Sequence, residues 1–231
     1  MLPRARSLLA VCAHPDDESF GLGATLHAFA LRGTKASVLC FTHGEASTLS
    51  REPAPSLHEI RAGELSAAAK VLGLDDVELR GYQDGALERT PLHLLVSDVE
   101  RCTAAAAAEL LLVFDEGGVT GHPDHRRATE AALAAGGDLP VLAWAVPEHV
   151  AHALNDEFAT TFVGRRDEDI DLRLEVDRRC QREAIGCHAS QAADNLVLRR
   201  RLELSGDHEV FRWLRAPATR SVLVGSESRI D

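Results

Sequence analysis

Basic residues are the minority charge in this chain of 231 residues, which holds 25 lysines and arginines against 36 aspartates and glutamates. The resulting net charge of −11 argues against nucleic acid or an anionic membrane as the main partner, because both are themselves negatively charged. The chain also lacks any run approaching the roughly 18 apolar residues of a membrane-spanning helix. We therefore predict a small-molecule partner, no nucleic acid and no membrane, while a homo-oligomer is compatible with the composition.

Cysteine is scarce, and the five cysteines at positions 12, 40, 102, 180 and 187 show no CxxC spacing. An odd number of cysteines without a framework indicates a reducing compartment, and we predict a cytoplasmic location. The N-terminus weakly imitates a signal peptide, since Arg4 and Arg6 precede the apolar residues 8–12. That apolar core is about six residues long, shorter than the roughly 7–15 residues of a signal sequence.

A dinucleotide-binding glycine pattern is also missing, because Gly21 and Gly23 are followed by Leu26 where a third glycine would stand. The hydrophobic pattern instead alternates strands with helices, which predicts a Rossmann-like α/β fold: a mostly parallel sheet with helices on both faces, in a single domain 1–231. We expect strands at 7–12, 37–42, 74–79, 110–114 and 141–146, and helices at 24–32, 57–72, 92–107, 126–135 and 177–191. Residues 149–168 mix helix and loop signals, 170–176 suit an edge strand or a lead-in, and 208–224 suit a last strand pair.

Residues 13–18 gather one histidine and three carboxylates directly after the apolar run 7–12. Strand ends are where α/β proteins place their chemistry, and such a concentration of negative charge favours a bound divalent cation. His14 and Asp17 are candidate ligands on one turn. The neighbouring Asp16 must point elsewhere and is a candidate base. The simpler alternative is a polar, solvated turn after a strand.

A second cluster, residues 121–125, follows the apolar run 109–114 and opens the predicted helix 126–135. His122 and His125 are three residues apart, which places them on one side of a first helical turn. Together the two clusters can supply two histidines and one carboxylate, the ligand set of an open hydrolytic zinc site.

These residues are also compatible with two other classes of protein. Two histidines and a carboxylate also form the facial triad of non-haem iron oxygenases, although the helix-rich pattern disfavours that class. A non-catalytic metal-binding or nucleotide-binding module is the non-enzyme alternative. Such a module would have no use for an unligated acid–base pair.

The pair of motifs His14-Pro15-Asp16-Asp17-Glu18 and His122-Pro123-Asp124-His125 resembles the PIG-L/LmbE family of metal-dependent N-deacetylases. The resemblance implies a hydrolase that removes an acetyl group from the amine of an N-acetylglucosamine-type sugar or a related small N-acyl substrate. An amidase of thiol-sugar conjugates would use the same chemistry and stays open.

The resemblance also implies a role for each motif residue. His14, Asp17 and His125 would bind Zn²⁺, with Fe²⁺ as the alternative metal. Asp16 would take a proton from the attacking water, and a protonated His122 would stabilise the oxyanion and protonate the leaving amine. Asp124 would orient an imidazole and hold its charge.

Arg61 lies in the predicted helix 57–72 and resembles the substrate-facing arginine of an Arg-x-x-Glu helix in the family. The alternative is a local ion pair with Glu64, three residues on. Glu64 is expected to interrupt the buried face of this helix. That face is predicted to comprise Leu57, Ile60, Ala67 and Val71 together with it.

Asp84 and His188 complete the expected substrate-binding set. Asp84 lies in a loop that resembles the family's Asp-Gly loop and would hydrogen-bond a sugar hydroxyl, although Asp84-Gly85 also suits a simple turn. His188 continues an apolar helical stripe, where a histidine is usually a core residue, but it also resembles a late His-x-Ser-Gln element of the family.

Overall fold

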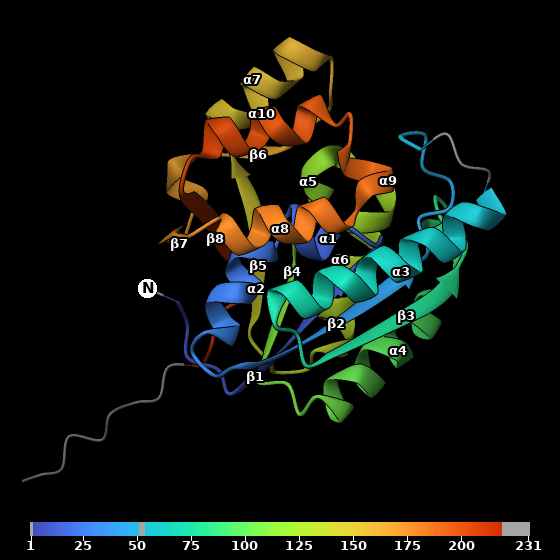
Figure 1. The fold of residues 1–231 in the computed structure, drawn as a ribbon. Helices are drawn as coiled ribbons and strands as arrows, with labels where there is room; N and C mark the ends of the chain where they lie inside the picture. Colours follow the sequence, from blue (N-terminus) through green and yellow to red (C-terminus); the bar gives the residue numbers. More distant parts are fainter. Residues whose placement is uncertain (1, 51–53, 219–231) are drawn as a thin grey trace, which may run out of the picture.

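The computed structural model describes residues 2–50 and 54–218, which form an α/β fold around one eight-stranded sheet (Figure 1). The strand order is β3-β2-β1-β4-β5-β8-β7, and β6 pairs with β5 beside this path. The strands are β1 (Ser7–Cys12), β2 (Lys35–Thr42), β3 (Asp76–Tyr82), β4 (Leu110–Phe114), β5 (Val141–Pro147), β6 (Gly164–Arg165), β7 (Leu172–Glu175) and β8 (His208–Arg215).

Strands β1 to β5 are parallel to one another, and β8 adds to β5 in the antiparallel direction with β7 outside it. The central strand β1 is entirely buried, as expected for a parallel strand that is covered on both faces. The predicted fold class, a mostly parallel sheet with helices on both faces, is therefore confirmed.

Helices cover both faces of the sheet. The α-helices are α1 (Asp17–Phe20), α2 (Gly23–Ala30), α3 (Ala54–Leu72), α4 (Leu92–Ala105), α5 (Gly118–Gly121), α6 (Pro123–Ala135), α7 (Glu148–Phe158), α8 (Arg179–Cys187), α9 (Ala189–Ala192) and α10 (Leu196–Ser205). Short 3₁₀ turns lie at Leu87–Arg89 and Asp167–Asp169. Helices α2, α3, α7 and α8 share one core cluster with the sheet, and α4 and α6 share the other.

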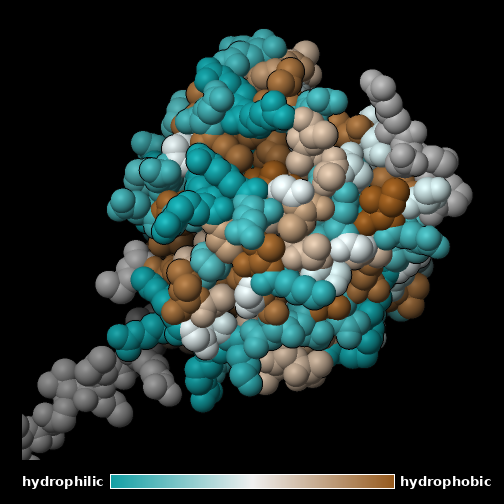
Figure 2. Space-filling view, in the orientation of Figure 1, coloured by the Kyte–Doolittle hydropathy of each residue, from teal (hydrophilic) through white to brown (hydrophobic). Residues whose placement is uncertain are grey.

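The alternation of side chains along β1 divides the core between these two layers. Leu8 and Ala10 pack with α2, α3 and α8, whereas Leu9 and Val11 pack with α4 and α6. Each fully buried leucine contributes about 1.5–3 kcal/mol of transfer free energy. Figure 2 shows mostly hydrophilic side chains on the outer surface of one helical layer, with apolar groups visible between α10 and α8.

Several predicted elements are shifted in the structure. Strand β3 begins two residues later than predicted, because Leu74 still caps α3 through a backbone hydrogen bond to Ala69. The predicted buried face of α3 is only partly right. Leu57 is buried as predicted, but Ile60 is 37% exposed, and Arg61 and Leu65 are buried instead. The predicted helix 177–191 breaks at His188, between α8 and α9.

The C-terminal third contains the elements that the pattern left open. Residues 149–168 hold most of α7, the short strand β6 and a 3₁₀ turn, and β7 is the expected edge strand. The expected strand pair in 208–224 is a single strand, β8, and residues 219–224 lie outside the described residues. No helix in the described part of the chain is long and apolar enough to cross a membrane.

Candidate active site

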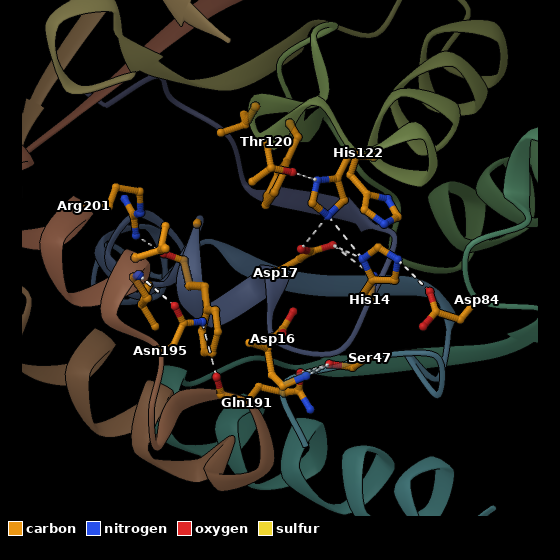
Figure 3. A pocket seen from close by; sticks show the side chains of 18 of the residues that line it. His14, Asp16, Asp17, Ser47, Asp84, Thr120, His122, Gln191, Asn195 and Arg201 are labelled. Carbon is orange, nitrogen blue, oxygen red and sulfur yellow. Dashed lines mark hydrogen bonds and ion pairs between the residues drawn. The ribbon is translucent and has the colours of Figure 1, made fainter. Parts of the chain in front are cut away.

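A cavity of about 500 Å³ lies at the carboxyl ends of the parallel strands (Figure 3). Its wall combines the turn after β1, the loops after β2 and β3, and the segment after β4, together with residues from α9 and α10. The order of the strands explains this meeting, because β1 lies between β2 and β4 and all three run in the same direction. Open α/β sheets bind their ligands at this edge.

Asp17 organises the turn that follows β1. Its Oδ2 atom accepts hydrogen bonds from the backbone N–H groups of Ala13 and His14, at 2.9 and 3.0 Å. Its Oδ1 atom lies 3.0 Å from Nε2 of His125 on α6. Burial by itself raises the pKa of Asp17, but His125 and His14 lower it well below its ordinary value, so the carboxylate is ionised.

The two imidazoles beside Asp17 are oriented by their outer nitrogens. Nε2 of His14 lies 3.0 Å from Oδ1 of Asp84, and Nδ1 of His125 lies 3.1 Å from the carbonyl oxygen of Gly118. These acceptors hold the ring protons on the outside, which is the arrangement that fixes the tautomer of a metal-binding histidine. The inner atoms, Nδ1 of His14 and Nε2 of His125, then face each other at 3.2 Å.

This arrangement of donor atoms fits a divalent metal ion. Two nitrogen lone pairs and the carboxylate of Asp17 converge. The two nitrogens are 3.2 Å apart, Nε2 of His125 lies 3.0 Å from Oδ1 of Asp17, and Nδ1 of His14 lies 4.0 Å from Oδ2. Donors on a tetrahedral Zn²⁺ at about 2.0–2.1 Å are roughly 3.3 Å apart. Burial lowers the pKa of His14, but Asp124, Asp84 and Asp17 raise it to about 10, so their charges favour a cation here.

A second set of side chains, His14, His122 and Asp124, also has donor atoms close enough for one ion. Its atoms are already engaged, however. The carboxylate of Asp124 accepts hydrogen bonds from the backbone N–H groups of Gly85 and Leu87, at 2.8 and 3.1 Å. Nδ1 of His122 accepts from the backbone N–H of Asp124 at 3.1 Å. The set of His14, Asp17 and His125 is therefore the better candidate.

Asp84 and Asp124 lie against the outer nitrogen of His14. Oδ2 of Asp124 is 3.4 Å from Nε2 of His14, and Asp124 is fully buried, which agrees with the predicted task of orienting an imidazole. Asp84 uses its second oxygen, Oδ2, to accept from the backbone N–H of Ala46 at 2.8 Å. Asp84 also lines the cavity, so its hydrogen bond to a sugar hydroxyl stays a prediction.

Asp16 lies next to the candidate metal ligands but points into another part of the cavity wall. Its backbone has a φ of 120°, a conformation that non-glycine residues adopt rarely and that concentrates at functional sites. Burial raises the pKa of Asp16 to about 6, although the guanidinium of Arg61 opposes that rise. A carboxylate with this pKa is suited to accept a proton near neutral pH.

Arg61 is buried and fixes Asp16 in place. It donates to Oδ2 of Asp16 at 2.9 Å, to the carbonyl of Gly44 at 2.5 Å and to the carbonyl of Pro15. Gly44 is required here, because a Cβ atom at this position would lie 1.9 Å from Nη1 of Arg61. The expected local ion pair is not made, since Glu64 instead accepts two hydrogen bonds from Ser190, both at 2.7 Å.

His122 lies in the cavity wall and caps the N-terminus of α6. Because Nδ1 accepts the backbone hydrogen bond from Asp124, the ring proton of the neutral form is on Nε2. Burial lowers the pKa of His122, and the neighbouring His14 and His125 lower it further. The geometry therefore favours a neutral His122 that donates from Nε2, in contrast to the protonated imidazole that we expected.

His188 does not line the cavity. It is completely buried, and its Nε2 lies 2.6 Å from Oε1 of Glu18. The other oxygen of Glu18 accepts the backbone N–H of Asp16 at 2.9 Å. This position does not suit the expected substrate contact. It places His188 and Glu18 behind the strained backbone of Asp16.

Other cavity residues were not identified from the sequence. Gln191 accepts a hydrogen bond from the hydroxyl of Ser47 at 2.6 Å, so α9 and the loop after β2 close one side together. Trp144 and Arg201 form part of another wall. Arg201 is one of three consecutive arginines, and only the packing of α10 distinguishes it from Arg199 and Arg200.

The donor atoms of two histidines and an aspartate converge at the strand ends of an α/β sheet, beside the half-buried carboxylate of Asp16. This arrangement is typical of metal-dependent hydrolases. Comparison of the sequence specifies the family. Residues 9–136, more than half of the chain, match the model of the PIG-L family, described as GlcNAc-PI de-N-acetylase. The chain belongs to the PIG-L family.

Relatives with named activities match most of the chain. A Bacillus anthracis protein described as "Probable N-acetyl-alpha-D-glucosaminyl L-malate deacetylase 2" is 30% identical over 213 residues, covering 90% of this chain and 92% of the relative. A Mycolicibacterium gilvum 1D-myo-inositol 2-acetamido-2-deoxy-alpha-D-glucopyranoside deacetylase is 31% identical over 225 residues, covering 80% and 79% of the two chains.

Solved structures show the same fold at lower identity. The 4-carboxy-2-hydroxymuconate hydratase GalB from Pseudomonas putida has a TM-score of 0.72 and 18% identity, with 94% of this chain and 99% of GalB covered. The N,N'-diacetylchitobiose deacetylase from Pyrococcus horikoshii has a TM-score of 0.68 and 20% identity, with coverage of 91% and 84%. The fold thus occurs with more than one reaction, and the reaction must be argued from the site.

Proposed function

We propose that this protein is a zinc-dependent N-deacetylase that removes the acetyl group from the amine of an N-acetylglucosamine-type sugar. The observation that carries the proposal is the convergence of His14, Asp17 and His125 beside the half-buried carboxylate of Asp16. The two relatives described above, both named as deacetylases of acetamido sugars, support the same reaction. Fe²⁺ is the alternative metal for the same ligands.

In this proposal each residue of the site has one task. A divalent ion held by His14, Asp17 and His125 supplies a Lewis acid, which polarises a carbonyl group and lowers the pKa of water toward ~7. Asp84 and the Gly118 carbonyl keep the inner nitrogens of the two histidines free of protons. Asp124 adds negative charge behind His14, which strengthens this imidazole as a ligand.

Asp16 moves the proton. Its carboxylate accepts a proton as water attacks the acetamide carbonyl, and Arg61 holds it in the orientation that this requires. His122 donates Nε2–H to the carbonyl oxygen as negative charge develops there. Asp16 then returns the proton to the departing amine nitrogen. A neutral His122 does not provide this proton, because its single ring proton is donated to the carbonyl oxygen. The products are acetate and the free amino sugar.

The proposal is tested by measuring acetate and primary amine released from a panel of N-acetylated sugars by the zinc-loaded protein, with Asp16→Asn as the matched inactive control. Equal yields of acetate and amine with the parent, and neither with the variant, support deacetylation. Cleavage of N-acyl thiol-sugar conjugates alone supports the amidase alternative. No amine from any substrate, with zinc bound, contradicts the proposal.

The other expectations from the sequence remain predictions. These are the assignment of 1–231 to one deacetylase domain, the cytoplasmic location and the oligomeric state.

A further inference from the structure

Arg201 is a buried cation in the cavity wall that the proposed mechanism does not use. It lies on α10, is 3% exposed and lines the cavity together with Phe20 and Trp144. Figure 3 shows it on the opposite side of Asp17 from His14, and therefore away from the candidate metal ligands.

The guanidinium of Arg201 is only partly satisfied by the protein. One nitrogen, Nη2, donates to the carbonyl oxygen of Phe20, and the group lies 5.0 Å from the centre of the Trp144 ring. The other terminal nitrogen, Nη1, is buried and has no hydrogen-bond partner. Burying a charged donor without an acceptor costs free energy, so we expect Nη1 to donate to an acceptor that the protein itself does not supply.

The buried carboxylate of Glu209 attracts Arg201 electrostatically but is hydrogen-bonded to other side chains. Glu209 accepts hydrogen bonds from Nη1 of Arg178 and, at 2.7 Å, from Nε1 of Trp144. Arg178 also donates to Gln181 and to two backbone carbonyls, so each nitrogen of its guanidinium has a partner. The ion pair of Glu209 is therefore made with Arg178 and not with Arg201. Burial lowers the pKa of Arg201 to about 10, with Glu209 opposing and Arg178 adding to that effect.

The first turn of α10 also faces this side of the cavity. It reaches the cavity through Asn195, Val197 and Leu198. Asn195 Oδ1 already accepts the N–H of Leu198, so the helix contributes its partial positive charge there rather than a set of free donors. The cavity volume of about 500 Å³ falls within the roughly 300–1,000 Å³ range of small-molecule sites and leaves room for a group beyond an amino sugar.

We propose that Arg201 is an anion subsite, and that the substrate carries a carboxylate or phosphate on the group attached to the amino sugar. The planar guanidinium fork is suited to both anions, and its free Nη1 supplies the donor. A neutral polyol would leave the buried positive charge uncompensated. This inference rests on the proposed deacetylase function and specifies its substrate class.

The test compares three acetamido sugars that differ only at the anomeric group: N-acetylglucosamine 1-phosphate, a glycoside of a hydroxy acid and the neutral methyl glycoside. The measured quantity is kcat/KM for amine release, expressed as the ratio of each anionic substrate to the neutral one. We expect a ratio of at least 10 for the parent protein, and the larger of the two ratios identifies phosphate or carboxylate as the preferred anion.

Arg201→Met should reduce this ratio to near one, and Arg201→Lys, which keeps the charge but loses the fork, should retain part of it. Arg199→Met is the matched control, since Arg199 is exposed on the same helix and its guanidinium donates to the backbone of Ala193. The control should keep the parent ratio. An unchanged ratio in Arg201→Met would show that the arginine has only a structural role.

Two outcomes separate this inference from the proposed function. A parent protein that releases amine from all three sugars with a ratio near one overturns the anion subsite alone, even if no Arg201 variant folds. A parent protein that releases no amine overturns the proposed function. In that case the same three compounds are titrated by calorimetry, and only tighter binding of an anionic sugar that Arg201→Met abolishes preserves the subsite.

Discussion

Asp16 and Asp17 are adjacent in the chain, yet the structure predicts opposite consequences when either loses its charge. In Asp16→Asn the three candidate ligands are untouched, so metal content should stay at one ion per chain. Arg61 keeps the carbonyls of Gly44 and Pro15 as acceptors, so the fold should be retained. Asparagine also tolerates a positive φ better than most residues.

The catalytic loss in Asp16→Asn follows from the loss of the proton acceptor. A positioned general base contributes about 10²–10⁴-fold to the rate, which corresponds to about 2.7–5.4 kcal/mol in the activation free energy. The variant should therefore bind metal like the parent and show a kcat lower by that factor.

Asp17→Asn should instead prevent metal binding. The amide oxygen of the new side chain can accept the hydrogen bonds from Ala13 and His14, which Oδ2 accepts in the parent. Its NH₂ group then occupies the position of Oδ1, 3.0 Å from Nε2 of His125, and donates to the lone pair that the metal needs. The turn is preserved, but the hydrogen bond to Nε2 of His125 blocks the nitrogen that would bind the metal.

Both variants are measured by elemental analysis of the purified protein and by amine release at saturating zinc. The parent and a thermal unfolding curve for each variant serve as controls for folding. If Asp16→Asn arrives without metal while Asp17→Asn retains it, the assignment of ligand and base is reversed and the mechanism above is refuted.

Three further outcomes are expected. Removing the metal with a chelator should abolish amide hydrolysis and lower Tm, and added zinc should restore both; full activity with metal content near zero would contradict the scheme. His188→Ala should lower kcat at least tenfold and also destabilise the fold by about 3–5 kcal/mol, because it removes the imidazole partner of the buried Glu18 carboxylate, which keeps only the hydrogen bonds from Ser19 and from the backbone of Asp16; His188→Gln, which can still donate to Glu18, should recover most of both, and an alanine variant with parental kcat and KM would make His188 a core residue only. At Asp98, burial raises the pKa but hydrogen bonds from Tyr82 and Arg80 lower it overall, so its contribution to stability is present above the unfolded pKa of about 3.9 and lost as the pH falls through the folded value. Asp98→Asn should therefore lower the free energy of unfolding by about 1–2 kcal/mol at pH 7, with the difference from the parent disappearing near pH 2 in urea titrations.

The sequence by itself determined the fold class and the location of the site. Apolar runs such as 7–12 and 110–114 are continuous because parallel strands are buried on both faces, and this makes them readable without a structure. The two histidine-aspartate motifs directly follow these strands. Because the carboxyl ends of neighbouring parallel strands meet at one edge, the sequence also predicted that His14 and His125 would meet.

The orientation of individual side chains was decided by tertiary packing. His188 was expected to contact substrate, but it is buried against Glu18 and lies outside the cavity wall. Asp84 and Asp124 both lie against His14, and only the folded chain shows which ring each carboxylate contacts. A local pattern specifies which face of an element is apolar. It does not specify which distant carboxylate lies against the outer nitrogen of a histidine ring.

Arg201 shows the same limit most clearly. Its neighbours Arg199 and Arg200 are chemically identical to it, and the helix that carries all three was not expected from the pattern. Only the packing of α10 against α1 and Trp144 removes one guanidinium from water while leaving its Nη1 without a partner. Burial of a charge depends on contacts between segments nearly two hundred residues apart in the chain, and such contacts exist only in the folded structure.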